Sequence, residues 1–428
     1  MIDRDNSLIN KIFFTLFAIV VFRVGSFIPI PGINPSIMKS FAYSNKEGIL
    51  GMFNVISGGS LSRMSVFALA IMPYITSSII IQLLSSIYTP LEDLKKEGQA
   101  GRRKIGQLSR YLTIVLASVQ AYGISIGLLS IKTELGPIVN IGNNIFITST
   151  VLTLVVGTTF LMWMGEQITD RGVGNGISVI IFAGIVSNLP SSFINLFELV
   201  KKGAISNISL LSILVIILAV LYIVVVFEKS YRKILVCYPN RSTSSRKFNN
   251  STSTHIPLKI NTSGVIPPIF AGSILLFPAT ISGFSSIDDS SFISKISMYL
   301  AHGKPLYILL YIILIIFFSF FYTSIVFNTV ETADNLKKSG AYLPGYRPGK
   351  NTAEYFDNVL TKLTVIGSVY LSVVCIVPEV LINNYSISFA LGGTTFLIIV
   401  NVILDTAMQI QTHMFSKKYE AMTKRIRV

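Results

Sequence analysis

The sequence predicts an all-α polytopic membrane protein with ten transmembrane helices. Hydrophobic residues make up 51% of the 428 residues and charged residues only 13%, whereas a soluble domain usually carries about 25% charged residues. The mean hydropathy of +0.65 leaves too little polar surface to cover a water-soluble particle of this size, which argues against a cytosolic enzyme. Ten stretches also reach the roughly 20 mostly apolar residues that a helix needs to cross a bilayer.

The ten predicted spans follow one another without a long polar linker, so the chain is treated as one membrane domain. They lie near residues 10–29, 66–87, 111–129, 145–165, 177–197, 208–227, 262–281, 305–327, 363–381 and 387–409. The fifth and seventh spans are the weakest, because Gly, Pro or Ser residues interrupt them. The stretch 242–254 is rich in Ser, Asn and Thr and is expected to be a solvated loop tip.

Lysine and arginine are unevenly divided between the two sides of the predicted spans. An even number of spans puts both termini on one side, which carries 26 Lys and Arg residues against 8 on the other, with Arg23 inside the first span. The positive-inside rule therefore places both termini in the cytoplasm. The net charge of +15 is explained first by this topology. Beyond topology, it favours an acidic partner such as RNA, anionic lipid or an acidic protein surface.

The sequence contains no recognisable catalytic, cofactor or metal site. Cys237 and Cys375 belong to no C-x-x-C pair and are interpreted as reduced and structural. The three histidines, His255, His302 and His413, share no metal-ligand spacing. No phosphate-binding G-x-x-x-x-G-K-[ST] motif is present, which argues against an ATPase. The first apolar stretch does not end in a cleavage site, so we expect it to be retained.

Few ionisable residues fall inside the predicted spans. Arg23 lies about two-thirds along the first span, where it is expected to snorkel or to face a wet cavity. Glu379 and Asp405 lie near span ends, so no carboxylate is placed at a midplane. The absence of such a carboxylate argues against an ion-coupled secondary transporter. That class remains the main alternative, because ten spans could form two five-span repeats. The glycine-rich run 172–176 is interpreted as a flexible turn entering the fifth span.

Segment 48–60 is too short and too rich in glycine to cross a bilayer. It could be a re-entrant or buried helix, or an amphipathic helix on the outer surface, and composition alone leaves both open. Uncharged polar residues inside the spans, such as Thr76 and Gln120, either line a wet passage or bond helix to helix. The basic loop 228–259 either meets an acidic partner or only sets topology.

Seven stretches of the chain together resemble one family. They are FRVGSFIPIPGI at 22–33, MFNVISGGSLSRMSVFALAIMPYITSSIIIQLL at 52–84, KKEGQAGRRKIGQ at 95–107, FLMWMGEQITDRGVGNGISVIIFAGIV at 160–186, STHIPLKINTSGVIPPIFAGSILLFPATI at 253–281, FNTVETADNLKKSGAYLPGYRPGKNTAEY at 327–355 and GGTTFLIIVNVILD at 392–405. In this order they resemble the SecY family of bacterial protein-conducting channels, and the proteobacterial form most closely. The chain departs from the family in its short N-terminal tail, its Ser/Asn-rich tip and its tail ending soon after Tyr419.

The resemblance implies a fold of two pseudo-symmetric five-helix halves, 1–197 and 198–428, around a central pore with a plug helix. It implies a gated passive channel, not an enzyme, that translocates unfolded preproteins with signal sequences and releases transmembrane helices laterally into the lipid bilayer. The implied partners are small subunits of the SecE and SecG type, the motor ATPase SecA and the ribosome. The implied location is the bacterial inner membrane, with the plastid thylakoid membrane as the alternative, and a poreless membrane insertase is a further rival.

The resemblance also assigns roles to individual residues. The implied pore ring is Ile71, Ile75, Ile177, Ile181, Ile269 and Ile398. The implied plug is Gly48, Ile49, Leu50, Gly51, Met52, Phe53, Asn54, Val55, Ile56, Ser57 and Gly58, within segment 48–60. The implied polar cluster of the lateral gate, formed by spans 2, 3, 7 and 8, is Thr76, Gln120 and Asn261. Loops 228–259 and 328–362 are implied to contact SecA or the ribosome through Arg246, Lys247 and Arg347.

Overall fold

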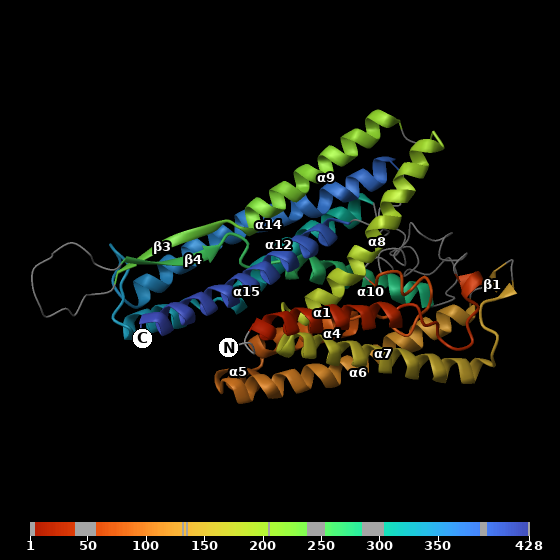
Figure 1. The fold of residues 1–428 in the computed structure, drawn as a ribbon, viewed down its shortest axis with the longest axis horizontal. Helices are drawn as coiled ribbons and strands as arrows, with labels where there is room; N and C mark the ends of the chain where they lie inside the picture. The colour runs from red at the N-terminus through yellow and green to blue at the C-terminus, as the bar shows by residue number, and fades with distance from the viewer. Residues whose placement is uncertain are drawn as a thin grey trace, which may run out of the picture.

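The computed structural model describes residues 5–38, 57–130, 132–133, 136–203, 206–237, 253–284, 304–385 and 392–426. Long helices run side by side in an elongated bundle (Figure 1). The first part contains α1 (Asp5–Gly25), α4 (Met72–Ile87), α5 (Thr89–Lys96), α6 (Gln99–Ser130), α7 (Asn143–Arg171) and α8 (Gly176–Lys201). The second contains α9 (Asn207–Glu228), α10 (Ile266–Phe284), α12 (Pro305–Val326), α13 (Thr329–Lys338), α14 (Lys350–Tyr385) and α15 (Gly393–Ile426).

Each predicted span coincides with one of these helices. Within the described ranges, eight helices are long and apolar enough to cross a membrane, and a ninth span results if α4 and α5, bent by 102°, are taken together. The apolar part of α10, Ile266–Leu275, is shorter. The predicted fold class of a helical polytopic membrane protein therefore agrees with the helices observed.

Several helix ends differ from the predicted span boundaries, and two of these differences lie close to the candidate site. The first span was expected to reach residue 29, but α1 ends at Gly25 and turns lead on to Pro29 and Pro31. The second span was expected from residue 66, but α4 begins at Met72 and turns precede it. Pro73 explains the later start, because proline is favoured in the first helical turn, where its missing N–H costs nothing.

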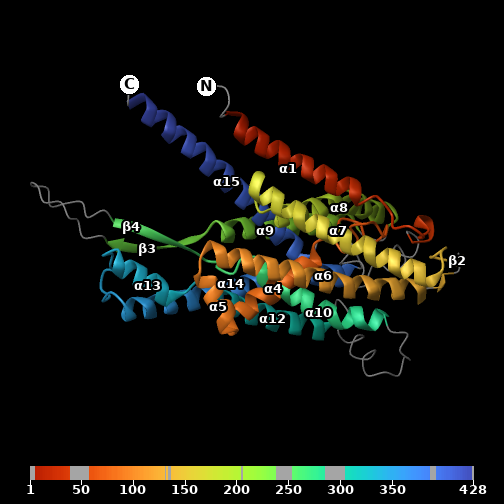
Figure 2. The same ribbon diagram turned by 90° about the horizontal axis from the view of Figure 1, so that it is seen from below.

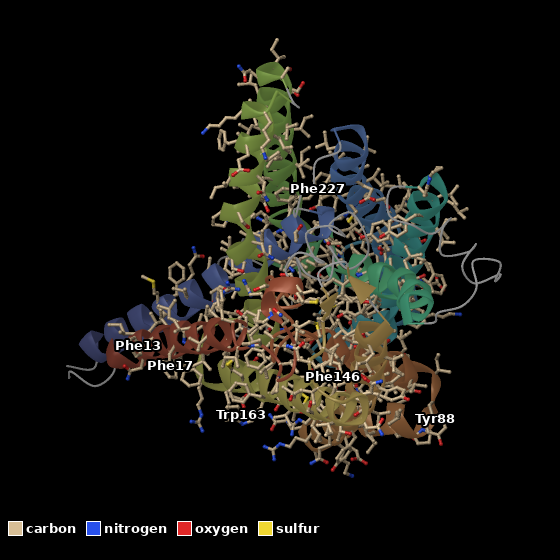
Figure 3. All side chains as sticks on the ribbon, turned by 90° about the vertical axis from the view of Figure 1, so that its right-hand side faces the viewer. Phe13, Phe17, Tyr88, Phe146, Trp163 and Phe227 are labelled. Atoms are coloured by element: carbon tan, nitrogen blue, oxygen red, sulfur yellow. The ribbon has the colours of Figure 1, made fainter. Side chains whose placement is uncertain are left out.

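The outer surface of the bundle is largely apolar, as expected of a protein surrounded by lipid. Phe13 and Phe17 on α1 are 70% and 60% exposed, and Trp163 and Tyr88 also lie more than half exposed (Figure 3). Phe146, by contrast, is fully buried. Exposed large apolar side chains in these numbers would be unfavourable in water, and they indicate faces that contact lipid or a partner helix.

The helices associate in two groups that meet along the bundle. In the first group α6 packs against α4 and α7, and in the second α12 packs against α10 and α14. Across the boundary, α15 packs on α8, and α10 packs on α6. The largest buried cluster draws residues from both groups, so the apolar centre lies where they meet. The division at residue 197 remains a prediction.

A β-hairpin projects from the second group, which the all-α prediction missed. β3 (Tyr231–Cys237) and β4 (Ser253–Lys259) pair antiparallel, and their buried side chains include Ile234, Val236 and Leu258. A two-residue pair, β1 (Lys132–Thr133) and β2 (Gly136–Pro137), lies elsewhere. The start of α1 and the end of α15 lie toward the hairpin end of the molecule (Figures 1 and 2).

Candidate functional site: an apolar constriction and its polar supports

The six isoleucines of the predicted pore ring all belong to one hydrophobic cluster. Three of them are buried members of the cluster, and three are partly buried residues packed against it. They come from four helices: Ile71 and Ile75 at the start of α4, Ile177 and Ile181 on α8, Ile269 on α10 and Ile398 on α15. The structure therefore brings together residues more than 300 positions apart in the sequence. Whether they surround a pore remains a prediction.

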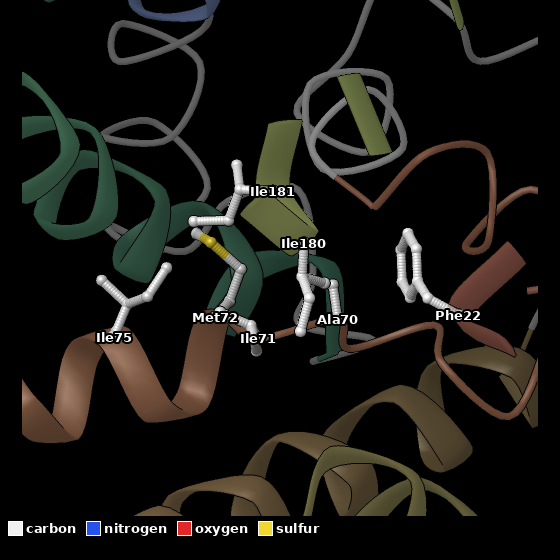
Figure 4. A pocket seen from close by; sticks show the side chains of 7 residues that line it. All are labelled: Phe22, Ala70, Ile71, Met72, Ile75, Ile180 and Ile181. Carbon is white, nitrogen blue, oxygen red and sulfur yellow. The ribbon is translucent and has the colours of Figure 1, made fainter. Parts of the chain in front are cut away.

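Local helix geometry aligns these side chains. The Ile75 N–H donates to the Ile71 carbonyl at 3.1 Å, which closes the first turn of α4 and puts both isoleucines on one face. The Asn175 side chain caps α8 by accepting the Ile177 N–H at 3.2 Å. Figure 4 shows Ile71, Ile75 and Ile181 around a small pocket that is lined only by apolar side chains. Such a wall offers no hydrogen bonds to water or ions.

The residue before this turn has an unusual backbone. Ala70, which also lines the pocket, has φ of +48°. A left-handed conformation costs a non-glycine residue about 1–2 kcal/mol. Strain of this kind is found mainly where surrounding packing enforces it, often at functional sites. The positive φ of Ala70 therefore indicates that packing determines the backbone conformation just before α4.

Two arginines hold the turn that precedes this entrance. The Gly58 carbonyl accepts hydrogen bonds from Arg23 Nη1 and from Arg63 Nη2, both at 3.2 Å. Arg23 Nη1 also donates to Ser187 Oγ on α8 at 2.8 Å. Both guanidinium groups lie over the Phe27 ring, at 5.3 Å and 4.2 Å from its centroid. Arg23 is thus fixed by protein contacts, which the sequence did not reveal. Burial lowers the pKa of Arg63, and the Arg23 charge lowers it further.

Gly58 and Gly59 fit closely against α8. Their φ angles are +68° and +82°, a region that favours glycine. A Cβ at Gly58 would lie 2.9 Å from the Gly184 Cα, so the two backbones are in contact. Ser57 and Ser60 are buried beside them. For residues 57–60 the buried interpretation is therefore favoured over a surface helix, while 48–56 lie outside the described residues.

The glycine-rich run at 172–176 forms the predicted turn into α8, and side chains of three helices bond to it. Thr15 of α1 accepts the Val173 N–H at 3.0 Å, and Thr169 of α7 accepts the Gly176 N–H at 2.9 Å. Gln409 of α15 accepts the Gly174 N–H at 2.8 Å. This last bond links the two helix groups.

The three predicted gate residues are not joined by hydrogen bonds. Thr76 Oγ1 donates to the Met72 carbonyl in its own helix, at 3.0 Å. Asn261 Nδ2 donates to Glu228 Oε1 at 2.7 Å, and no hydrogen bond is found for the Gln120 side chain among the described residues. The resemblance implies mutual hydrogen bonds within this cluster, and the structure contradicts them, because Thr76 bonds within its own helix and Asn261 donates to the carboxyl group of Glu228. Glu228 was missed, although it is the only acid in loop 228–259.

Arg347 lies on an exposed turn. Its carbonyl accepts Thr352 Oγ1 at 2.9 Å, and the neighbouring Tyr346 ring packs on Tyr355 with centroids 4.4 Å apart. The backbone of the tip is thus fixed, while the Arg347 side chain is exposed. Arg246 and Lys247 lie outside the described residues. Within the described ranges, no three His, Cys, Asp or Glu side chains gather into a metal site.

These observations define a class: a polytopic helical membrane protein whose two helix groups converge on an apolar centre. A family model described as SecY matches residues 65–407, and the chain belongs to the SecY family. A protein translocase subunit SecY from Rickettsia bellii is 60% identical over 99% of this chain and 98% of its own length. That of Escherichia coli strain K12 is 49% identical over 97% of this chain and 94% of its own length.

Solved channel structures share the fold. One described as a protein-conducting channel has a TM-score of 0.66. A SecY structure, in which the plug domain is said to stabilise the closed state and maintain a membrane seal, has 0.64, and Sec61 in a canine ribosome–channel complex has 0.63. Each of the three is 17% identical in sequence to this chain. Each match covers 95% of this chain and 92% of the other chain. These likenesses confirm the predicted fold class, and no comparison supports an ion-coupled transporter.

Proposed function

We propose that this chain is the central pore-forming subunit of a Sec translocase. It acts as a gated passive channel through which unfolded preproteins cross the membrane, and it releases transmembrane helices laterally into lipid. The observation that carries the proposal is the convergence of isoleucines from α4, α8, α10 and α15 in one apolar cluster. An apolar ring expels water when empty, yet offers a passing polypeptide no hydrogen bonds to hold it.

Segment 48–58 would be the plug that closes this constriction from the outer side. Support comes from its described end, where Gly58 contacts α8 and is held by Arg23 and Arg63. The solved SecY relative, described as having a plug domain that maintains a membrane seal, supports the same role. Thr76 and Gln120 are proposed to line the lateral gate separately, since Asn261 bonds elsewhere.

The proposed location is the bacterial inner membrane with both termini in the cytoplasm. The relatives are bacterial, which favours this membrane over the thylakoid. The hairpin end would then face the cytoplasm, where Arg347 and the hairpin would contact SecA or the ribosome. A relative in a ribosome–channel complex supports a ribosome contact. SecE and SecG type subunits are proposed to cover exposed apolar helix faces such as that of α1.

The test is translocation of a preprotein into proteoliposomes that contain this chain, SecE and SecG type subunits and externally added SecA with ATP. Protease protection of the preprotein, dependent on its signal sequence, is the expected result. An unchanged proton or sodium gradient during transport would separate the channel from an ion-coupled carrier. Absence of protected preprotein at a channel density at which the E. coli translocase works would contradict the proposed function.

A further inference from the structure

Glu228 is a buried carboxylate that the channel function has not explained. It is the last residue of α9 and is only 5% exposed. Its hydrogen-bond partner is the neutral amide of Asn261, which is 2% exposed. The nearby cation Lys259 lies 4.0 Å from Asp405, and its charge is shared between that acid and Glu228. Burying a carboxylate costs free energy unless it is well hydrogen-bonded, so breaking the Glu228–Asn261 hydrogen bond would be unfavourable.

Asn261 also organises the chain that leads into α10. Its Nδ2 donates to the Gly264 carbonyl at 3.2 Å, and its Oδ1 accepts Ser263 Oγ at 3.3 Å. Gly264 has φ of +64°, which turns the chain before α10 begins at Ile266. One amide thus bonds the end of α9 and the turn into α10 at the same time.

The β3–β4 hairpin emerges between these two anchor points. Its first strand pair is Tyr231 with Lys259, and the Ile260 N–H donates to the Ser230 carbonyl at 3.2 Å just below. The Glu228–Asn261 bond is the next connection between the two chain segments toward α9 and α10. A Cβ at Gly367 of α14 would lie 3.2 Å from the Ile260 carbonyl, so the hairpin base is also tightly enclosed. A displacement of the paired strands would therefore reach α9 and α10 together.

α10, whose start such a displacement would reach, lies at the boundary between the two helix groups. α10 packs against α4 and α6 across the boundary as well as against α12. It also contributes Ile269 to the apolar cluster. Repositioning the start of α10 would change both the boundary and the constriction. Figure 2 shows α10 beside α4, α6 and α12, with the hairpin at the far end of the bundle.

We propose that Glu228 and Asn261 form a positioning pair that couples the cytoplasmic hairpin to α10, so that a protein docked on the hairpin biases the gate. This inference rests on the proposed channel function. Both side chains are buried, at 5% and 2% exposed, so they are covered from a preprotein or a docked protein in this state. Loss of the pair should therefore uncouple docking from translocation, while docking itself stays intact.

The test exchanges the two polar groups. Asn261→Asp places a second carboxylate against Glu228, whereas Glu228→Gln combined with Asn261→Asp restores one amide donor and one carboxylate with side chains of the same length. Thr262→Val is the matched control, because the buried Thr262 Oγ1 has no hydrogen-bond partner in the described part of the chain. SecA binding and ATP-driven preprotein translocation are measured in proteoliposomes at equal channel density.

We expect Asn261→Asp to bind SecA as the native channel does but to translocate about tenfold more slowly, the loss typical of a buried group left without its partner. The double variant should recover part of the lost rate, because the glutamine introduced at position 228 can again donate to the residue at 261, while the aspartate introduced at 261 cannot donate to the Gly264 carbonyl. Thr262→Val should match native. The inference is overturned if Asn261→Asp translocates normally, if it loses SecA binding, or if the double variant is as slow as the single one. Should Asn261→Asp fail to accumulate, Glu228→Ala replaces it, and normal translocation or loss of SecA binding in that variant would likewise overturn the inference. A native channel that translocates nothing would overturn the proposed function itself.

Discussion

The contact between Gly58 and α8 leads to the sharpest prediction about the closed channel. Gly58→Ala introduces a methyl group at φ of +68° and within 2.9 Å of the Gly184 Cα. The left-handed conformation costs an alanine about 1–2 kcal/mol. Because the atom it meets is backbone, the turn must also move away from α8. The change weakens the closed state selectively, since the strain is relieved once the turn leaves the helix.

The expected size follows from this strain. A loss of about 2 kcal/mol from the closed state raises the open fraction about 30-fold, since 1.4 kcal/mol corresponds to a factor of ten. Gly59→Ala is the matched comparison, because its φ is +82° but its nearest neighbour is the Arg63 side chain at 3.1 Å. A flexible side chain can yield, so we expect a smaller rise. Gly340→Ala, at φ +73° with nothing within 4 Å, should leave the closed state unchanged.

Ion conductance across planar bilayers measures the resting open fraction, and export of a preprotein with a defective signal sequence measures the same balance in cells. We expect both to rise in the order Gly340→Ala, Gly59→Ala, Gly58→Ala. Equal conductance and equal signal dependence in all three variants, at normal abundance, would refute the reasoning. The turn would then be a structural contact with no part in closing the channel.

Three further predictions concern the ring, the plug and the docking tip. Ile71→Gly or Ile398→Gly should raise resting ion conductance, because a wider and less apolar constriction stays wet; unchanged conductance in both would remove them from the ring. Deleting 48–58 should give a channel that folds, leaks and accepts defective signal sequences, whereas failure to fold would make the segment part of the core. Arg347→Glu should leave abundance and topology intact but strongly reduce SecA-driven translocation, and Arg347→Lys should recover only part of it, because lysine lacks the planar fork. Wild-type translocation by Arg347→Glu at several salt concentrations would exclude this tip as the motor contact.

The helices were predictable because each one carries its signal locally. The composition of an apolar stretch such as that of α9 predicts a membrane-spanning helix, whatever the neighbouring segments are. Helix ends were less predictable, since Ala70 takes a positive φ that only packing explains. The β3–β4 hairpin was missed because the basic residues of loop 228–259 suggested solvent, while Ile234 and Val236 bury against other segments.

The polar contacts were the least predictable part of the site. Arg23 was recognised as unusual, but the carbonyl that binds it comes from Gly58, 35 residues along the chain. Asn261 was assigned to the gate because of the family resemblance, yet the nearest strong acceptor in space is Glu228. Patterns of residue type indicate that a polar group needs a partner. They do not identify the partner, because this depends on how distant helices pack.

The strength of these contacts agrees with a channel that partners can open. Shifting a two-state equilibrium from 1:99 to 99:1 takes about 5.5 kcal/mol of differential binding. The arginine contacts to Gly58 and Ser187 are three hydrogen bonds from charged donors, each with a net value of about 1.5–3 kcal/mol when buried and less when partly exposed, as here. The isoleucine cluster adds no hydrogen bond that a polypeptide would have to break. Under the proposed function, a closed state held by a few such bonds, and destabilised by the backbone strain at Ala70, would lie within reach of the free energy that a docked motor and a signal sequence would supply together. A bundle sealed by a buried ion-pair network would not open at that cost.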